Sequence, residues 1–221
     1  KPLLIVRGTV GAIALMFVYY AVITLPLAEA TILQYLHPVF TAILALVFLK
    51  ETVQRSTIAC IVISLLGLFV MIQPNLYIES SVQYPWLSIG AGVLGAFGSA
   101  VAYVIVKKLT KTDDSSVIIF YFPLIALPIA LILLGNDFVM PSLAATGLLV
   151  LIGIFTQIGQ VGLTKALHCA DANKATTYAY VQVLFSVFIG WAYFSEVPVA
   201  TTIIGGGLIM VGALINVLWK R

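Results

Sequence analysis

Polar side chains interrupt several long apolar stretches of this sequence, and their spacing places them on single helical faces. Gln34, His37 and Thr41 lie at i, i+3 and i+7 within 27–49, so a helix there carries them as one stripe. Amide, imidazole and hydroxyl groups form hydrogen bonds with a ligand while carrying no fixed charge. These residue types therefore predict recognition of a small molecule through hydrogen bonds.

Two further stripes follow the same pattern later in the chain. One lies within 175–195 and consists of Tyr178, Gln182 and Ser186. The other lies within 138–164 and includes Gln157 and Gln160. If the three stripes converge, they line a hydrogen-bonding cavity. The aromatic residues expected to form its walls are Tyr19, Tyr20, Tyr35, Tyr103 and Tyr180.

The elements that carry these stripes are predicted from composition and charge spacing. The chain has 221 residues, of which 62% are hydrophobic and 9% charged, whereas about 25% of the residues of a soluble domain are charged. Stretches without Asp, Glu, Lys or Arg cover 8–28, 30–49, 56–78, 80–106, 115–136, 138–164, 175–195 and 197–219. A helix crosses a bilayer with about 20 apolar residues, and each stretch is long enough. We therefore expect an all-α polytopic membrane protein with eight transmembrane helices.

The basic residues give an orientation for these eight helices. If the spans alternate in direction, all 11 Lys and Arg residues fall on one side, and Glu29, Glu79, Asp137 and Glu196 fall on the other. Because cytoplasmic loops carry the excess of Lys and Arg, the basic side is expected to be cytoplasmic, with both visible termini there. The expected location is a bacterial inner membrane or a plasma membrane.

An internal repeat links the two parts of the chain. A shift of 145 residues places 8–72 on 153–217 and matches Gly8 with Gly153, Tyr35 with Tyr180, Glu51 with Glu196 and Gly67 with Gly212. The two copies lie five spans apart, so the second is inverted, which is typical of transporters. We expect 1–78 to be the last three helices of a first repeat whose two N-terminal helices are missing. We expect 79–221 to be a complete five-helix repeat.

The sequence resembles the drug/metabolite transporter superfamily, and within it the EamA-type permeases. In the first repeat, the motifs that carry the resemblance are Arg7-Gly8, Leu27–Thr31, Pro38-Val39-Phe40 and Phe48–Glu51. In the second, they are Ala172–Thr176, Tyr180–Phe185 and Phe194–Pro198. The first block is also similar to the solute-carrier 35 G-type proteins. The resemblance covers the whole chain as helices 3–10 of a ten-helix, 5+5 inverted repeat. It implies alternating access around a central cavity.

Each polar residue has a structural alternative to substrate binding. Gln, Ser and Thr in membrane helices often serve only to hydrogen-bond neighbouring helices. For His37 and Gln182, which the repeat aligns, lining of the cavity is favoured. His37 titrates near neutral pH when exposed, so proton coupling is one alternative, and a ring kept neutral by burial is the other.

Residues near span ends are expected to have structural roles. Arg7 is expected to anchor its helix at the membrane interface, with an anion contact as the alternative. Glu51 and Glu196 are expected to cap helix ends or to pair with a basic group. Pro38 is expected to kink its helix. The glycines at 90–98 and 205–212 are expected to allow close helix packing.

Other functions find less support in the sequence. Membrane enzymes need paired carboxylates, a metal cluster or a nucleophile with its base, yet the predicted spans hold one His and no acidic residue. No link resembles a channel filter. A non-transporting receptor or assembly scaffold is the remaining alternative. We expect a transporter of a small neutral or zwitterionic metabolite such as an amino acid, in contact with lipid. We expect no cofactor, metal or nucleic acid. A homodimer is possible.

Overall fold

The protein is all-helical in the computed structural model, which describes residues 2–25, 30, 33–78, 85–135, 139–194 and 200–219. The elements of the first part are α1 Pro2–Thr24, α3 His37–Leu44, the π-helical turn η1 Ala45–Leu49 and α4 Arg55–Ile78. Those of the second part are α5 Trp86–Leu109, α6 Ser115–Leu134, α7 Leu143–Cys169, α8 Ala172–Thr177, the 3₁₀ turn η2 Tyr178–Val181, α9 Gln182–Phe194 and α10 Ala200–Leu218.

Each charge-free stretch of the sequence overlaps one or more of these helical segments. Helices α1, α5, α6 and α7 are long and apolar enough to cross a membrane, and 37–49, 55–70 and 203–215 form shorter apolar helices. Without water in the hydrocarbon core, a spanning chain must satisfy its backbone groups internally, which a helix does. The expectation of an all-α membrane protein is confirmed.

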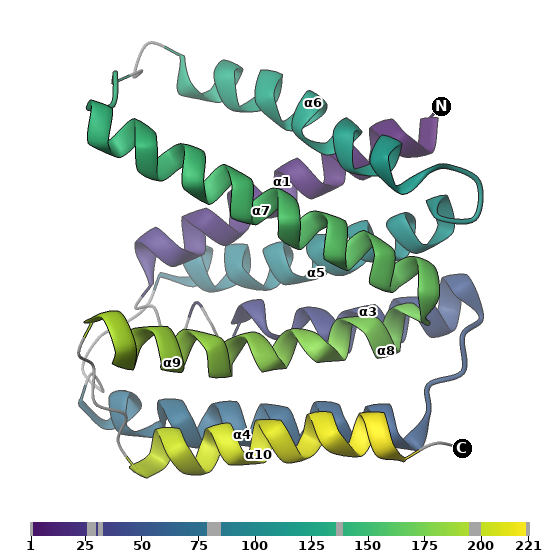
Figure 1. The fold of residues 1–221 in the computed structure, drawn as a ribbon, viewed down its shortest axis with the longest axis vertical. Coiled ribbons are helices and arrows are strands. Elements are labelled where there is room, and N and C mark those ends of the chain that lie inside the picture. The colour runs from purple at the N-terminus through teal and green to yellow at the C-terminus, as the bar shows by residue number, and fades with distance from the viewer. Residues whose placement is uncertain are drawn as a thin grey trace.

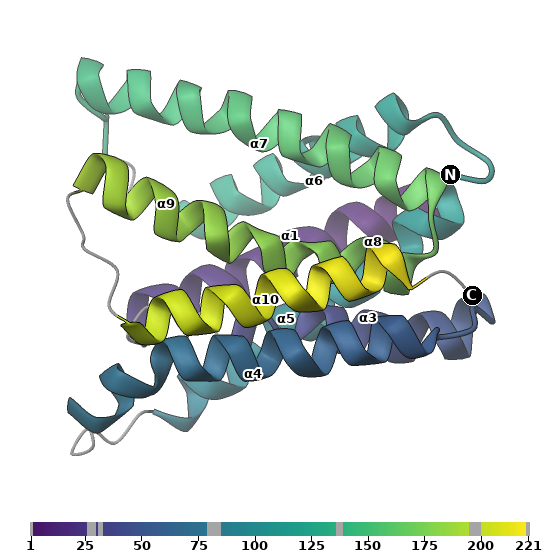
Figure 2. The ribbon, with the colours of Figure 1, turned by 60° about the horizontal axis from the view of Figure 1, so that its bottom comes forward.

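The helices pack in successive layers, which Figures 1 and 2 show from two directions. Helices α4 and α10 run side by side along one edge, next to the layer of α3, α8 and α9. Helices α1 and α5 pack together in the following layer, and α6 and α7 cover the far side. The beginning of α1 and the end of α10 lie at the same end of the molecule (Figure 1).

The expected helices at 30–49 and 175–195 are both interrupted, and at matching positions. Tyr35 and Leu36 form a turn before α3 begins at His37, while η2 covers 178–181 before α9 begins at Gln182. His37 and Gln182 are 145 residues apart, which is the shift of the internal repeat. Pro38 therefore lies in the first turn of α3 instead of kinking a continuous helix, because Pro is tolerated where no N–H partner is needed.

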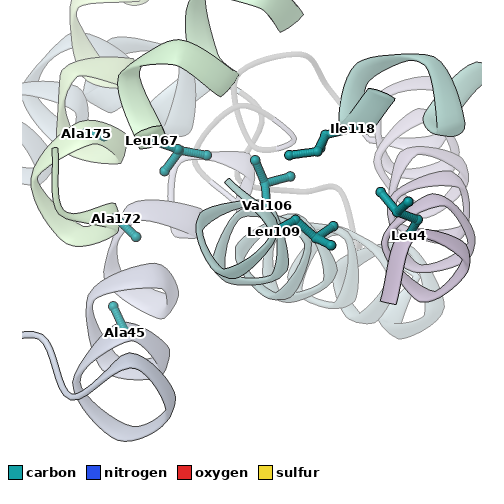
Figure 3. Packing of buried hydrophobic residues seen from close by; sticks show 8 residues of the cluster. All are labelled: Leu4, Ala45, Val106, Leu109, Ile118, Leu167, Ala172 and Ala175. Atoms are coloured by element: carbon teal, nitrogen blue, oxygen red, sulfur yellow. The ribbon is translucent and has the colours of Figure 1, made fainter. Parts of the chain in front are cut away.

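One end of the bundle contains an apolar cluster. We call it the basic end, because Lys50, Lys107, Lys108, Lys111 and Lys174 lie at or near the helix termini there. Figure 3 shows that the side chains of the cluster come from α1, η1, α5, α6, α7 and α8 and converge between these helices. The cluster consists of Leu4, Ala45, Val106, Leu109, Ile118, Leu167, Ala172 and Ala175.

Glycines bring α4 and α10 into close contact, as expected from the sequence. A Cβ at Gly67 would lie 2.6 Å from the carbonyl oxygen of Gly205, and a Cβ at Gly212 would lie 2.9 Å from Oγ of Ser64. Gly67 and Gly212 are also paired by the repeat. A Cβ added at Gly90 or Gly207, by contrast, would meet no atom within 4 Å, so close packing explains only part of each glycine cluster.

Candidate functional site

A buried arginine lies where α1, α5, α6 and α7 meet. The side chain of Arg7 is only 4% exposed although the residue lies five positions after the start of α1. Its Cζ lies 4.6 Å from the centroid of the Phe122 ring on α6, and Nη2 donates a long hydrogen bond of 3.5 Å to Oε1 of Gln160 on α7. The expected interfacial anchor is therefore wrong, because an anchor keeps its charged group in contact with water.

The side chain of Arg7 reaches toward the middle of α1. A Cβ at Gly11, one turn further along the helix, would lie 2.6 Å from Nη1 of Arg7. Side chains on a helix normally lean toward its N-terminus, and an arginine near a span end extends toward the interface. The opposite direction is open here because residue 11 lacks a side chain.

The guanidinium of Arg7 is under-satisfied. Nε is buried and has no hydrogen-bond partner, and no carboxylate of the described residues pairs with the group. A cation–π contact contributes about 0.5–2 kcal/mol. Leaving a buried charge unpaired costs about 3–5 kcal/mol, so the Phe122 ring alone does not offset the burial.

His37 and Tyr103 continue this polar region toward α3. The imidazole of His37 is 6% exposed and packs edge-on against the Tyr103 ring on α5, with 5.4 Å between ring centroids. Its Nδ1 is buried without a hydrogen-bond partner. Tyr103 also lies within the range of a Coulomb interaction with the Arg7 guanidinium. We call Arg7, His37, Tyr103 and Gln160 the polar cluster.

The first and third predicted stripes only partly reach this cluster. His37 and Gln160 belong to it, whereas Gln157 is exposed on α7 and Gln34 is half-buried just before the turn at Tyr35. The Thr41 hydroxyl is fully buried and donates to the backbone oxygen of His37 at 2.8 Å. The Thr41 hydroxyl proton is therefore donated within α3 and not to a ligand.

The second stripe lies elsewhere. Tyr178 and Gln182 are both exposed, and Gln182 makes no hydrogen bond to His37. Ser186 belongs to α9, but its side chain lies outside the described residues. Tyr20 is exposed near the end of α1. The polar cluster therefore includes none of Tyr178, Gln182 and Tyr20.

Tyr35 and Tyr180, also expected in the cavity wall, pack on each other in the core. Their rings stack with 5.8 Å between centroids, and the Tyr180 hydroxyl donates to the backbone oxygen of Tyr35 at 3.1 Å. They belong to one apolar cluster with Ile61, Leu68 and Ile209. Tyr35 lies in the turn before α3, and Tyr180 lies in the 3₁₀ turn before α9. The contact between the two tyrosines therefore connects the two helix interruptions.

At the basic end, Glu51 caps α8, which lies far along the chain. Oε1 accepts from the backbone N of Ala172 at 3.0 Å, and Oε2 accepts from the backbone N and Nδ2 of Asn173 at 3.3 and 3.0 Å. A carboxylate at a helix N-terminus satisfies free N–H groups and interacts favourably with the helix dipole. The expected capping role is confirmed for Glu51, while Glu196 lies outside the described residues.

Sequence reasoning missed Arg7 and Phe122 as partners in a buried site. The signal that could have found Arg7 is Gly11 at i+4 on an otherwise apolar face, because a glycine there leaves space for a long side chain. Phe122 stands in a uniformly apolar helix, where periodicity does not distinguish it. The cluster combines a fixed cation, an imidazole, a phenol and an amide, which are groups that recognise polar ligands. No group of three metal-binding side chains occurs among the described residues.

Comparisons with known proteins agree with this architecture. Residues 2–73 and 86–218 match the EamA-like transporter family. The pseudopaline exporter of Pseudomonas aeruginosa is 36% identical over 214 residues, which cover 96% of this chain and 74% of the exporter. Human solute carrier family 35 member G1 is 30% identical over 228 residues, covering 99% of this chain and 62% of the human protein.

A solved crystal structure shares the fold, with a TM-score of 0.81 over the whole chain and 77% of the other protein, at 20% identity. The resemblance to the drug/metabolite transporters is thus confirmed, and these relatives point to a transporter rather than an enzyme. This chain belongs to the EamA-like transporter family and is an integral membrane protein.

Proposed function

We propose that this transporter moves a small neutral or zwitterionic metabolite, such as an amino acid, by alternating access. The observation that carries the proposal is the polar cluster, in which the buried Arg7 of α1 and His37 of α3 contact half-buried polar residues of α7 and α5. Buried polar atoms without partners are costly in a membrane protein, and they are retained where a ligand supplies the partner. The cluster contains no acidic residue, which disfavours a cationic substrate.

We also infer two inverted repeats, 1–78 and 79–221, with two further helices before α1. The matching helix breaks before His37 and Gln182 support the repeat. Helix α1 packs against α5 and α6, whereas only Thr164 and Leu167 are buried in α7, its counterpart under the repeat. Two preceding helices, equivalent to α5 and α6, would cover α7. The basic end is proposed to face the cytoplasm, since the Lys and Arg residues gather there.

Counterflow in liposomes tests the function. The full-length protein is reconstituted with unlabelled internal substrate, and entry of labelled amino acids and nucleotides is followed. We expect saturable uptake of at least one amino acid and a loss of at least about tenfold in His37→Ala, because removal of a buried ligand contact costs about 1.5–3 kcal/mol.

His168→Ala is the matched control, because the second histidine is exposed at the end of α7. Its uptake should equal that of the wild type. Absence of counterflow for every compound, in protein that is folded and correctly inserted, would contradict the transport proposal. Equal uptake by His37→Ala and the wild type would move the binding site away from the polar cluster.

A further inference from the structure

We propose that Arg7 is the binding site for a carboxylate group of the transported metabolite. This inference rests on the proposed function and names the substrate class: a metabolite with a free carboxylate. It starts from the position of the guanidinium, which is 4% exposed and lies between Phe122 on α6 and Gln160 on α7.

No charge of the protein's described part compensates Arg7. All eight Asp and Glu residues lie outside the predicted spans, and none of those in the described ranges pairs with the guanidinium. The group has five N–H donors, of which one makes a long hydrogen bond of 3.5 Å and Nε makes none. An anionic ligand would supply both the charge and the acceptors.

A carboxylate fits this site better than a phosphate. The planar guanidinium binds a carboxylate through two parallel hydrogen bonds, and one negative charge balances one arginine. A phosphate monoester carries nearly two negative charges, whereas the polar cluster contains a single fixed cation. The uncharged acceptor and donor groups of Gln160, Tyr103 and His37 remain for the rest of the metabolite.

The surroundings of Arg7 keep it directed into the protein. Gly11 leaves room for Nη1, and the Phe122 ring covers one face of the guanidinium. The Gln160 carbonyl holds Nη2 but leaves Nε free. An acceptor on the Nε side would satisfy this donor. Because Nε is buried, the surrounding helices must move to admit the ligand, as alternating access requires.

Thermal unfolding of the purified full-length protein tests this site independently of transport. The probes are the standard L-α-amino acids, each compared with its α-carboxamide, and inorganic phosphate. We expect at least one amino acid to raise the Tm of the wild type while its carboxamide does not. Arg7→Gln should weaken the apparent affinity for that amino acid by about tenfold or more. Arg7→Lys should be intermediate, because it keeps the charge without the planar fork.

Further variants separate binding from folding. Arg55→Gln is the matched control for loss of a cation, since Arg55 is exposed at the start of α4. Gly11→Ala should displace the guanidinium and weaken binding, whereas Gly90→Ala, whose added Cβ meets no atom within 4 Å, should not. Without ligand, Arg7→Gln should unfold at the same or a higher temperature than the wild type, because it removes an unpaired buried charge.

The outcomes distinguish this inference from the transport proposal. Equal affinity of Arg7→Gln and the wild type for the amino acid, stabilisation by the carboxamide as well, or stabilisation by phosphate alone would each overturn the carboxylate site. If amino acids stabilise the wild type but not Arg7→Gln, the carboxylate site is supported. If no counterflow occurs in the same protein, the transport proposal is contradicted. If an amino acid and its α-carboxamide show equal counterflow, the protein is a transporter but Arg7 does not bind a carboxylate.

Discussion

Tyr180 shows how a single side chain can stabilise an interrupted membrane helix. Its hydroxyl donates to the backbone oxygen of Tyr35 at 3.1 Å, directly at the turn that precedes α3. A free carbonyl buried in a membrane protein is costly, and Tyr180 supplies the donor from 145 residues further along the chain. The stacked rings add apolar contact between the two interruptions.

Tyr180→Phe should therefore destabilise the protein by about 1 kcal/mol, the net value of one hydrogen bond, while it retains the ring contact. The measurement is the unfolding temperature in detergent. Tyr178→Phe is the matched control, because Tyr178 is exposed two residues earlier in the same 3₁₀ turn. Equal unfolding temperatures for Tyr180→Phe and the wild type would show that the hydroxyl does not stabilise the break.

At the scale of elements, Glu51 connects the end of η1 to the start of α8. The connection depends on the backbone around Lys50, which has a left-handed conformation with φ of 56° directly after the π-helical turn. Lys107 adds a second contact at this end, because its Nζ donates to the backbone oxygen of Ala170 at 2.6 Å. Together with the apolar cluster, these contacts hold the helices together at the basic end.

Glu51→Ala should lower stability by about 0.5–2 kcal/mol, the value of a helix cap, and should open the basic end. Opening is measured as faster alkylation of Ala175→Cys, which replaces a buried residue of the apolar cluster, in a Cys169→Ser background. Asp171→Asn is the matched control, because Asp171 stands at the N-cap of α8 without a capping hydrogen bond. Similar effects of both variants would contradict a specific role for Glu51.

The sequence predicted the helical segments well and the internal breaks poorly, for a physical reason. Charge spacing marks where a chain leaves the membrane, so α5 and α6 coincide closely with the expected 80–106 and 115–136. A break inside an apolar run leaves no such mark, and Pro38 alone predicted a kink rather than a turn at Tyr35 and Leu36.

At the scale of the whole molecule, the candidate site depends on contacts that the sequence does not encode locally. The spacing of polar residues predicted that His37 and Gln160 lie on helix faces that line a polar site. It did not predict that Gln182 is exposed or that Arg7 is buried. Arg7 and Gln160 are 153 residues apart, and their meeting follows from the packing of α1 and α7 around α5 and α6. Such long-range packing is fixed by the fold as a whole.

The most direct test of the account is whether the transported metabolite occupies the polar cluster. Gln160→Cys is introduced into the otherwise native protein, and alkylation of each cysteine is followed by mass spectrometry with and without the metabolite. Cys169, exposed at the end of α7, is the internal control, and Cys60 is buried. We predict that the metabolite slows alkylation of Gln160→Cys several-fold and leaves Cys169 unchanged. Saturating metabolite that leaves the alkylation rate at position 160 unchanged would contradict a substrate site in the polar cluster.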